Sequence, residues 1–457
     1  MGIDMKLPMA APNLDDLWRE LDVSRRLSAL LEVEPLSDGE YYHWDQLRHR
    51  QPPSDLTAEE WWLGVKIARS KILKPLPFTD KKGASFQYGM PDPVLRLLHG
   101  IDQDASGRIQ MAEEVTNPAT RDRYIVNSLI EESIRSSQLE GASTTTDVAK
   151  NMIRSGRRPT DRSEQMIVNN YMAMRFVQQH AQQRLTPELV FALHRTVSDN
   201  TLDDPQKAGR FRSDSDNVIV EDGLRNVLHV PPAAKELPSR LKTLCAFANE
   251  RSTATFMHPV VRAIILHFIM GYDHPFVDGN GRTARALFYW SMLSQGYWLT
   301  EYLSISRILR KAPGQYSRAF VYSETDDNDL TYFAIYQLQV IRRAIVDLQR
   351  YLRRKISELR QIESLLRSSD DLNHRQLALL THALKHPGAK YTVLSHQVSH
   401  NIVYDTARTD LLGLATRGFL QQRKSGRAYL FTAPTDLSGR LRGRSTATRS
   451  DTPAHGR

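Results

Sequence analysis

An apolar run that ends in a turn unable to continue a helix constrains this chain more than any other stretch. The run VVRAIILHFIMGY at 260–272 is long enough to form a buried helix, and HPFVDGNGRTAR follows it at 274–285. The turn at 278–281 contains two glycines and an asparagine, which favour positive φ and expose backbone N–H groups. The residues RTARALFYWSML after the turn contain no Gly or Pro and predict a second helix. Polar groups crowded at the end of a buried helix are costly unless they are satisfied or used. The sequence therefore predicts a functional turn between two core helices.

The residues around this turn are of the kinds that bind anions. A glycine-rich turn that opens into a helix directs unpaired N–H groups and a positive dipole end at one point. Arg282 and Arg285 are spaced i and i+3, so both guanidinium groups are expected on one face of the first helical turn. His274 adds a titratable base. Two other interpretations stay open: a plain loop with solvated arginines, or a zinc site at His267 and His274, for which no third ligand follows at zinc spacing.

The segment HPFVDGNGRTAR resembles, without a gap, the HxFx(D/E)GNGRxxR signature of Fic-domain proteins, enzymes that mostly transfer AMP from ATP to a protein hydroxyl. The resemblance implies that His274 accepts the proton of the target hydroxyl, a role that suits histidine because its pKa lies near working pH. It also implies that Asp278 holds a Mg²⁺ ion that bridges the α- and β-phosphates of ATP. Phe276 would be a core anchor that fixes the loop.

The same resemblance assigns the remaining residues of the turn to the phosphates of ATP. Gly279, Asn280 and Gly281 would supply the anion hole that stabilises charge in the transition state. Arg282 and Arg285 would clamp the phosphate tail. The spacing by itself supports only an anion site beside a base.

A second resemblance lies at the end of the helix predicted for RDRYIVNSLIEESIRSSQLE at 121–140, where Gly141 suits the C′ position. Ser136, Glu140 and Gly141 are similar to the (S/T)xxxE(G/N) inhibitory motif found in Fic proteins that are inhibited by an N-terminal helix. The resemblance implies that Glu140 pairs with Arg285 and occupies the place that a γ-phosphate needs. The alternative is a surface glutamate, which at this end of a helix would be mildly unfavourable to the dipole.

Two short β-rich runs, at 218–220 and 227–230, are separated by Glu221-Asp222-Gly223, and Asp-Gly between such runs predicts a hairpin. In the Fic fold a β-hairpin flap lies over the active site at this point in the order, and it is thought to hold the target by strand addition. Val220 and His229 would then lie near its edges and dock the target; otherwise the hairpin is a surface feature. Tyr316 is a candidate to stack on the base of the nucleotide or to pack in the core.

Residues 370–435 resemble a winged helix-turn-helix domain. Asn373 caps a first helix, a short helix is predicted at 391–399 and a longer one at 404–416, and the β runs FLQQR and AYLFT flank a basic turn at 424–427. The side chains that could meet DNA are Thr406, Arg408, Thr409, Lys424 and Arg427. Winged helices also serve as protein-docking modules, so DNA and protein both remain possible partners.

The composition bounds the class of protein. The chain has 457 residues, of which 40% are hydrophobic and 25% charged, so most of it should fold into two or three domains. The net charge of +9 makes a polyanionic partner such as ATP or nucleic acid easier to accept. The single cysteine, Cys245, lies in an apolar run and is expected to be a core thiol in a reducing compartment. We see no secretory signal and no run long enough to span a bilayer, so a soluble cytoplasmic protein is expected.

The expected fold is mainly α: a Fic-type helical core with a β-hairpin flap, plus a C-terminal winged helix-turn-helix domain. The predicted parts are an N-terminal helical region at 1–120, the Fic core at 121–345 with the inhibitory helix at 121–141, a connecting helix at 346–369, the winged helix at 370–435 and a disordered basic tail at 436–457. The connecting helix keeps a 3–4 apolar spacing and could also pair with a second chain, which leaves a homodimer possible.

The predicted function is that of a protein adenylyltransferase that uses ATP and Mg²⁺ and is inhibited by Glu140. The alternatives are a DNA-binding regulator whose Fic core senses nucleotide, and a Fic enzyme that uses UTP or a phosphocholine nucleotide or that removes AMP. The target protein and the modified hydroxyl do not follow from the sequence.

Overall fold

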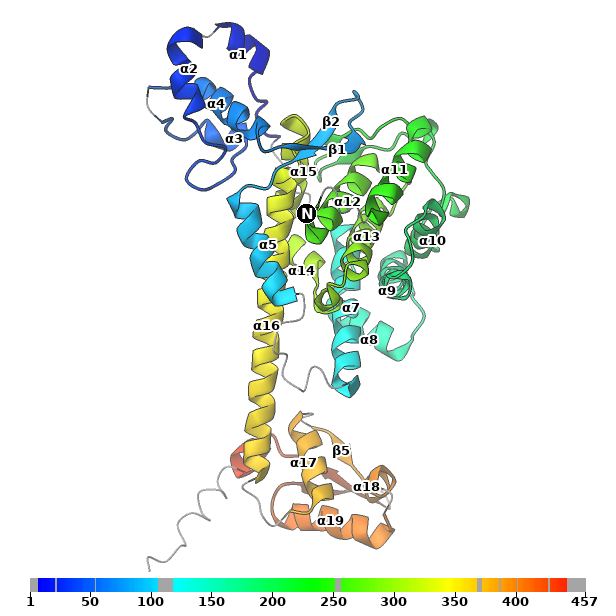
Figure 1. Ribbon diagram of the computed structural model, residues 1–457. Coiled ribbons are helices and arrows are strands. Elements are labelled where there is room, and N and C mark those ends of the chain that lie inside the picture. The colour runs from blue at the N-terminus through cyan, green and yellow to red at the C-terminus, as the bar shows by residue number, and fades with distance from the viewer. Residues whose placement is uncertain are drawn as a thin grey trace, which may run out of the picture. The chain divides into compact units, whose positions relative to one another are not determined.

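The computed structural model describes residues 7–20, 23–53, 55–105, 118–250, 256–367, 372–385, 388–400, 402–425 and 428–441. The chain is mainly helical with a few small sheets, and it divides into two compact units, residues 1–348 and 349–457 (Figure 1). This confirms the mainly α class expected from the sequence. No helix among these residues is both long enough and apolar enough to cross a membrane.

The elements of the first unit run in the following order. They are α1 (Leu14–Glu20), α2 (Val23–Leu31), α3 (Trp44–Leu47), α4 (Ala58–Ser70), β1 (Lys74–Thr79), β2 (Ser85–Tyr88), α5 (Asp92–Ala105), α7 (Pro118–Leu139), α8 (Thr146–Ser155), α9 (Arg162–His180), α10 (Pro187–Ser198), β3 (Val220–Glu221), β4 (Val227–His229), α11 (Leu237–Asn249), α12 (Pro259–Asp273), α13 (Asn280–Ser294), α14 (Ile305–Leu309), α15 (Pro313–Thr325) and α16 (Thr331–Arg367), which continues into the second unit.

The main core of the first unit surrounds α12 and α13, which pack against each other. Proline at the first position and the His258 side chain, which accepts a hydrogen bond from the backbone N–H of Val260, start α12, and its residues are almost all buried. Helices α7, α9 and α10 pack near this pair (Figure 1). Cys245 is buried in the same core, and burial raises the pKa of its thiol to about 12, so it is the core thiol that we predicted.

Helix α7 is fixed to this core by polar contacts as well as by packing. The buried carboxylate of Glu132 accepts hydrogen bonds from Ser304 Oγ at 2.9 Å and from the backbone N–H of Ser306 at 3.1 Å. Burial raises the pKa of Glu132. One turn further on, Ser137 Oγ donates to the carbonyl of Met166 at 3.1 Å. The helix that carries the predicted inhibitory motif is therefore a structural part of the first unit.

The N-terminal part has a small core of its own, built on Trp44, Trp61 and Trp62. Thr57 and Glu60 form a capping box at the start of α4. A hairpin, β1–β2, occupies residues 74–88, and its prolines are tolerated on the free edge of a two-stranded sheet. The buried pair between Lys66 Nζ and Asp326, at 2.6 Å, ties this part to the end of α15.

The second unit has a separate core and a defined order of elements. These are α17 (His374–Lys385), β5 (Lys390–Tyr391), α18 (Val393–His400), α19 (Tyr404–Thr416), β6 (Gln421–Ser425) and β7 (Ala428–Thr432), with strand order β5-β7-β6. Leu437 and Leu441 are buried in the same core, so residues 436–441, which were predicted to be part of a disordered tail, belong to the folded unit. Residues 442–457 of that tail, and Arg427, lie outside the described residues.

Candidate active site

The end of α12 and the start of α13 place the motif at the edge of a cavity. His274 terminates α12 with a left-handed φ of 44°, and Gly279 caps α13 with φ of 80°. Asn280 fixes the turn between them, because its side chain accepts from the backbone N–H of Phe276 at 2.9 Å and donates to the Phe276 carbonyl at 2.8 Å. Asn280 is buried, so only its backbone can serve the predicted anion hole.

The imidazole of His274 has a defined tautomer. Its Nδ1 lies 2.9 Å from the carbonyl of Gly271, which can only accept a hydrogen bond, so Nδ1 carries the proton and Nε2 keeps its lone pair. Burial lowers the pKa of His274 below its ordinary value, which favours the neutral ring. His274 lines the cavity, and a neutral imidazole with a free nitrogen is suited to accept a proton.

The cavity has a volume of about 420 Å³ and lies between the flap hairpin, the ends of α7 and α12, and α13 and α15. Its walls are mixed in character, with polar groups near α13 and more apolar ones near α15. The main lining residues are Glu140, His274, Gly281, Arg285, Val220, Leu228, Tyr316, Phe320 and Glu324. The volume and the mixed lining are typical of a small-molecule site.

Arg285 is the cation of this cavity, and it is already paired. Its Nη2 donates to Oε1 of Glu140 at 2.8 Å and to the carbonyl of Ser136 at 3.0 Å, and its Nε donates to Ser136 Oγ at 2.8 Å. Burial alone would lower the pKa of Arg285, but the Glu140 carboxylate outweighs it and the pKa lies above the ordinary value. A Cβ atom at Gly281 would collide with Oε1 of Glu140, so the carboxylate lies directly over the first turn of α13.

The residues of the inhibitory motif thus meet the second arginine of the glycine turn in space, although 145 positions separate Glu140 from Arg285. Gly141 has φ of 93°, the left-handed conformation expected of a residue that ends a helix.

Arg282 does not line the cavity, in contrast to its expected place beside Arg285. It is buried behind the turn, where Nη1 donates to the carbonyl of Val197 at 3.0 Å. Its Nε and Nη2 are buried without a hydrogen-bond partner. Guanidinium atoms in the interior that lack a hydrogen bond are costly, and they are suited to a further anionic acceptor.

Asp278 also lies outside the cavity lining, and it is in reach of two arginines. Its Oδ2 is 3.5 Å from Arg162 and 3.6 Å from Arg282, and its side chain is 41% exposed. No group of three His, Cys, Asp or Glu side chains that could hold a metal occurs among the described residues. An accessible single carboxylate still fits Mg²⁺, which is often held by one or two carboxylates together with substrate phosphates.

Two further histidines support the site without facing it. His194 stacks on Phe276, with ring centroids 3.7 Å apart, and its Nε2 lies 2.9 Å from the carbonyl of Asp278. His267 Nε2 lies 2.8 Å from the hydroxyl of Tyr316. Burial lowers the pKa of His194 to about 4 and that of His267 to about 3, so both rings are neutral. His194 is a buried core histidine with hydrogen-bond partners at both ring nitrogens.

The hairpin predicted as a flap is present, with Val220 opposite His229. Both Val220 and His229 line the cavity, and the imidazole of His229 is held between α12 and α15. Its Nδ1 lies 2.7 Å from Glu324, and its Nε2 lies 2.7 Å from the carbonyl of Tyr272. The ring is thus held between a carboxylate of α15 and a backbone carbonyl of α12. His229 therefore fastens the flap to α12 and α15.

Replacing His229 with alanine is expected to loosen the flap. Loss of a charge-assisted hydrogen bond, about 1.5–3 kcal/mol, would raise local opening about 10- to 100-fold. Hydrogen–deuterium exchange of the amides at 218–230 measures this opening. Val227→Ala, an exposed position on the same strand, is the matched control. Unchanged exchange in His229→Ala would contradict the fastening role.

Sequence reasoning missed Arg212, which positions the base. Arg212 is buried, its Nε donates to the carbonyl of His274 at 2.8 Å, and its Nη2 donates to the carbonyl of Pro232 at 2.5 Å. Its backbone N–H also bonds the carbonyl of Pro275. In the sequence, Arg212 is only an arginine among loop-forming residues, and nothing near it indicates this role.

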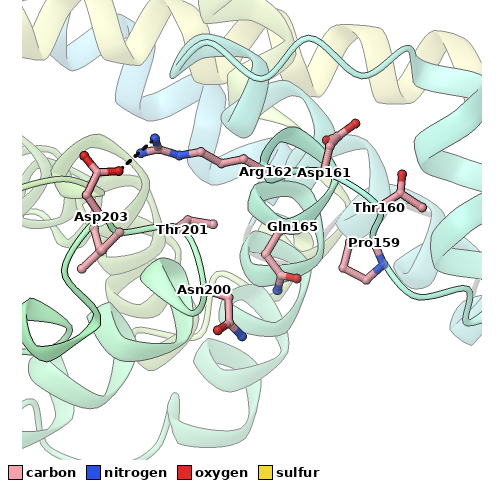
Figure 2. Close-up of a pocket in the computed structure, with 9 residues that line it drawn as sticks. Pro159, Thr160, Asp161, Arg162, Gln165, Asn200, Thr201 and Asp203 are labelled. Atoms are coloured by element: carbon pink, nitrogen blue, oxygen red, sulfur yellow. Dashed lines mark ion pairs between the residues drawn. The ribbon is translucent and has the colours of Figure 1, made fainter.

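A second, more open hollow of about 330 Å³ lies beside the start of α9, and Figure 2 shows its polar walls. Arg162 reaches from it to Asp203 and to Asp278. None of the residues predicted for the site lines this hollow.

Residues 184–292 match the Fic/DOC family. A "Protein adenylyltransferase Fic" of Drosophila virilis is 28% identical over 206 residues, which cover 44% of this chain and 40% of the relative. The protein of the same name from Drosophila melanogaster is 27% identical, with 44% and 39% covered. The chain therefore matches less than half the length of these relatives.

A crystal structure of a Fic family protein from Desulfovibrio desulfuricans G20 superposes with a TM-score of 0.52 at 19% identity, covering 76% of this chain and 98% of that chain. This likeness concerns the fold. The family match includes the whole segment from His274 to Arg285, so the fold predicted for the core is confirmed and this chain carries a Fic domain.

Proposed function

We propose that this chain is a protein adenylyltransferase that transfers AMP from ATP to a hydroxyl of a target protein and is restrained by Glu140. One observation carries the proposal: the free Nε2 of His274 and the guanidinium of Arg285 open on one cavity, and Glu140 occupies that guanidinium. The relatives named protein adenylyltransferase supply the class of reaction.

In the proposed reaction the target hydroxyl oxygen attacks the α-phosphorus of ATP. The bond to the bridging oxygen breaks, pyrophosphate leaves, and the hydroxyl proton passes to Nε2 of His274. The neutral ring that burial favours is the form that accepts this proton. Arg212 holds the carbonyl of His274 and so positions the base without touching the reactants.

The phosphates would lie at the start of α13. The backbone N–H groups of Gly279, Asn280 and Gly281 would face them, and Arg285 would bind the terminal phosphate once Glu140 leaves. The Nε and Nη2 atoms of Arg282, which have no hydrogen-bond partner, would fit a further phosphate oxygen if the turn shifts toward them. Asp278 would hold Mg²⁺ together with the phosphates, and the ion would neutralise their charge.

In the resting state Glu140 competes with the terminal phosphate of ATP for the same guanidinium. A carboxylate on Arg285 both removes the positive charge and fills the space above Gly281. Ser136 contacts Arg285 through hydrogen bonds separate from that of Glu140, so it would orient the guanidinium for either anion. Gly141 lets the chain turn directly after Glu140.

The flap would hold the target segment, and α15 would hold the nucleoside of ATP. Val220 lines the cavity from the flap and would dock the target segment, as predicted. Tyr316 lines the opposite side, and because its hydroxyl is tied to His267, its ring is the part available to the nucleoside.

The identity of the donor is testable directly. The Glu140→Gly variant, added to a cell lysate with ATP labelled at either the α- or the γ-phosphate, should raise protein labelling above that of the lysate alone with the α-label only, because kinases of the lysate already use the γ-label. An excess of unlabelled ATP should suppress the signal, and the same excess of UTP should not. A rise in labelling from the γ-position when the variant is added, or stronger competition by UTP, would contradict the proposal. Release of AMP from labelled protein by the unmodified chain would show the removal reaction instead.

A further inference from the structure

The positive charge of the chain is concentrated in the second unit. Residues 349–457 contain 19 Lys and Arg against 8 Asp and Glu, a net charge of +11. The whole chain has 61 against 52, so residues 1–348 hold the remaining 42 against 44, a net charge of −2. Such asymmetry between parts of one chain is typical of nucleic-acid binding.

The acidic groups of the folded part face inward or are already paired. Asp410 is buried, and Oδ2 accepts from Arg375 Nε at 2.7 Å while Oδ1 accepts from Asn373 at 2.7 Å. Asp436 accepts from Arg440 at 3.0 Å. Between 372 and 441 only Asp405 remains as an exposed acid without a counter-ion among the described residues.

Exposed basic side chains occur on several elements of the second unit, among them one helix and the strand that follows it. Arg408 and Thr409 are exposed on α19, and Arg423 and Lys424 are exposed on β6. None of the three basic residues has an ion-pair partner within the described ranges. Successive residues of β6 point to opposite faces of the thin β6–β7 hairpin, so the hairpin can contact phosphates on two sides.

We propose that the second unit binds double-stranded DNA, with α19 in the major groove and the β6–β7 hairpin on the phosphate backbone. A helix with its side chains is about 10–12 Å wide, and the major groove of B-DNA is about 12 Å wide. The major groove of A-form RNA is too narrow to be read in this way. This proposal does not depend on the adenylyltransferase activity.

A feature of the same unit favours the competing class of partner. Leu394 and Val398 on α18 and Val403 and Tyr404 at the start of α19 are exposed, with Val398 73% accessible. Exposed apolar side chains that gather in one region often mark protein interfaces. The net charge of +11 favours a polyanion over a protein as the partner. The experiment below also tests for a protein interface.

Binding is measured with the full chain and a fluorescent 30-base-pair DNA duplex of mixed sequence, by anisotropy from about 50 to 300 mM salt. We expect saturable binding that weakens with salt. In a plot of the logarithm of the binding constant against the logarithm of the salt concentration, each phosphate contacted should contribute about −0.9 to the slope. Arg423→Ala with Lys424→Ala should reduce the slope by about 0.9–1.8 and weaken binding about tenfold at low salt. Lys82→Ala with Arg96→Ala removes the same charge from exposed positions of the first unit and should change neither.

Two results would overturn the proposal. The first is no binding to the duplex at roughly 100 µM chain in low salt, which is weaker than ordinary non-specific affinity. The second is equal loss of affinity in the two double variants, which would locate the contact outside the hairpin. A dimer that forms without DNA and dissociates in Leu394→Ser, with no duplex binding, would identify the surface as a protein interface. The His274→Ala variant should bind the duplex as the unmodified chain does, which separates this test from the proposed catalysis.

Discussion

Replacing His274 with alanine is expected to lower AMP transfer on the order of 10²- to 10⁴-fold, the usual contribution of a general base. The free Nε2 on the cavity is lost, while Arg285 and the start of α13 remain. The measurement is transfer of label from α-labelled ATP, made in the Glu140→Gly background so that the starting rate is high. The affinity for ATP, measured by calorimetry, should change little because the base binds no phosphate.

The left-handed backbone at His274 calls for a matched variant. Alanine at φ of 44° is strained, whereas asparagine tolerates this conformation and can still donate to the carbonyl of Gly271. His274→Asn should therefore keep the fold and lose transfer as alanine does. If His274→Asn retained the full rate, His274 would not be the base.

The pH dependence of transfer follows from the same residue. The base works as the neutral ring, so the rate should rise with pH through the pKa of His274 and level off above it. Because burial lowers that pKa, the half-maximal rate is expected below pH 6.5, the ordinary histidine value. A half-maximal rate well above pH 6.5 would contradict a buried neutral base.

Replacing Glu140 with glycine is expected to raise AMP transfer about 10- to 100-fold. Glu140 makes a charge-assisted hydrogen bond with a buried arginine, and such a bond contributes about 1.5–3 kcal/mol, which ATP must otherwise overcome. The same variant should bind ATP more tightly by a similar factor. Calorimetry with ATP and Mg²⁺ and the labelling assay measure the two effects independently.

Two matched variants distinguish the effect of the Glu140 charge from the effect of loosening the helix end. Glu140→Gln keeps an oxygen that Arg285 can donate to but removes the negative charge, so an intermediate rise is expected. Gln138→Gly places a glycine in the same helical turn, where the side chain contacts Thr144 and Arg135 and not the cavity, and it should not activate. Equal activation by Gln138→Gly would attribute the effect to loosening of the helix end.

The motif from His274 to Arg285 was predictable because it is continuous in sequence and its turn residues restrict the backbone. The contact between Glu140 and Arg285 came from a second motif, since no local rule joins two residues so far apart in the chain. Arg212 could not be predicted, because its partners are carbonyl groups that any sequence would offer. The position of each element relative to its neighbours decides such contacts.

Side-chain direction was the weakest part of the sequence reasoning. The i, i+3 spacing placed Arg282 beside Arg285, but the carbonyl of Val197 draws Arg282 behind the turn. His229 was expected near a docking edge of the flap, and Glu324 with the carbonyl of Tyr272 holds it inward. In both cases the side-chain direction is set by hydrogen-bond acceptors that are distant in sequence. The periodicity of a strand or a helix contains no information about such acceptors.

The anchoring of α7 has a consequence for how Glu140 is displaced. The buried carboxyl group of Glu132 makes three hydrogen bonds to Ser304 and Ser306, so sliding or withdrawing the helix would leave its oxygens buried without partners, at a cost of at least about 1–3 kcal/mol. Rotating the Glu140 side chain, in contrast, breaks only its hydrogen bond to Arg285. We therefore expect an incoming triphosphate to compete with one rotating side chain, on the nanosecond scale of such rotations, while the backbone beneath it stays in place.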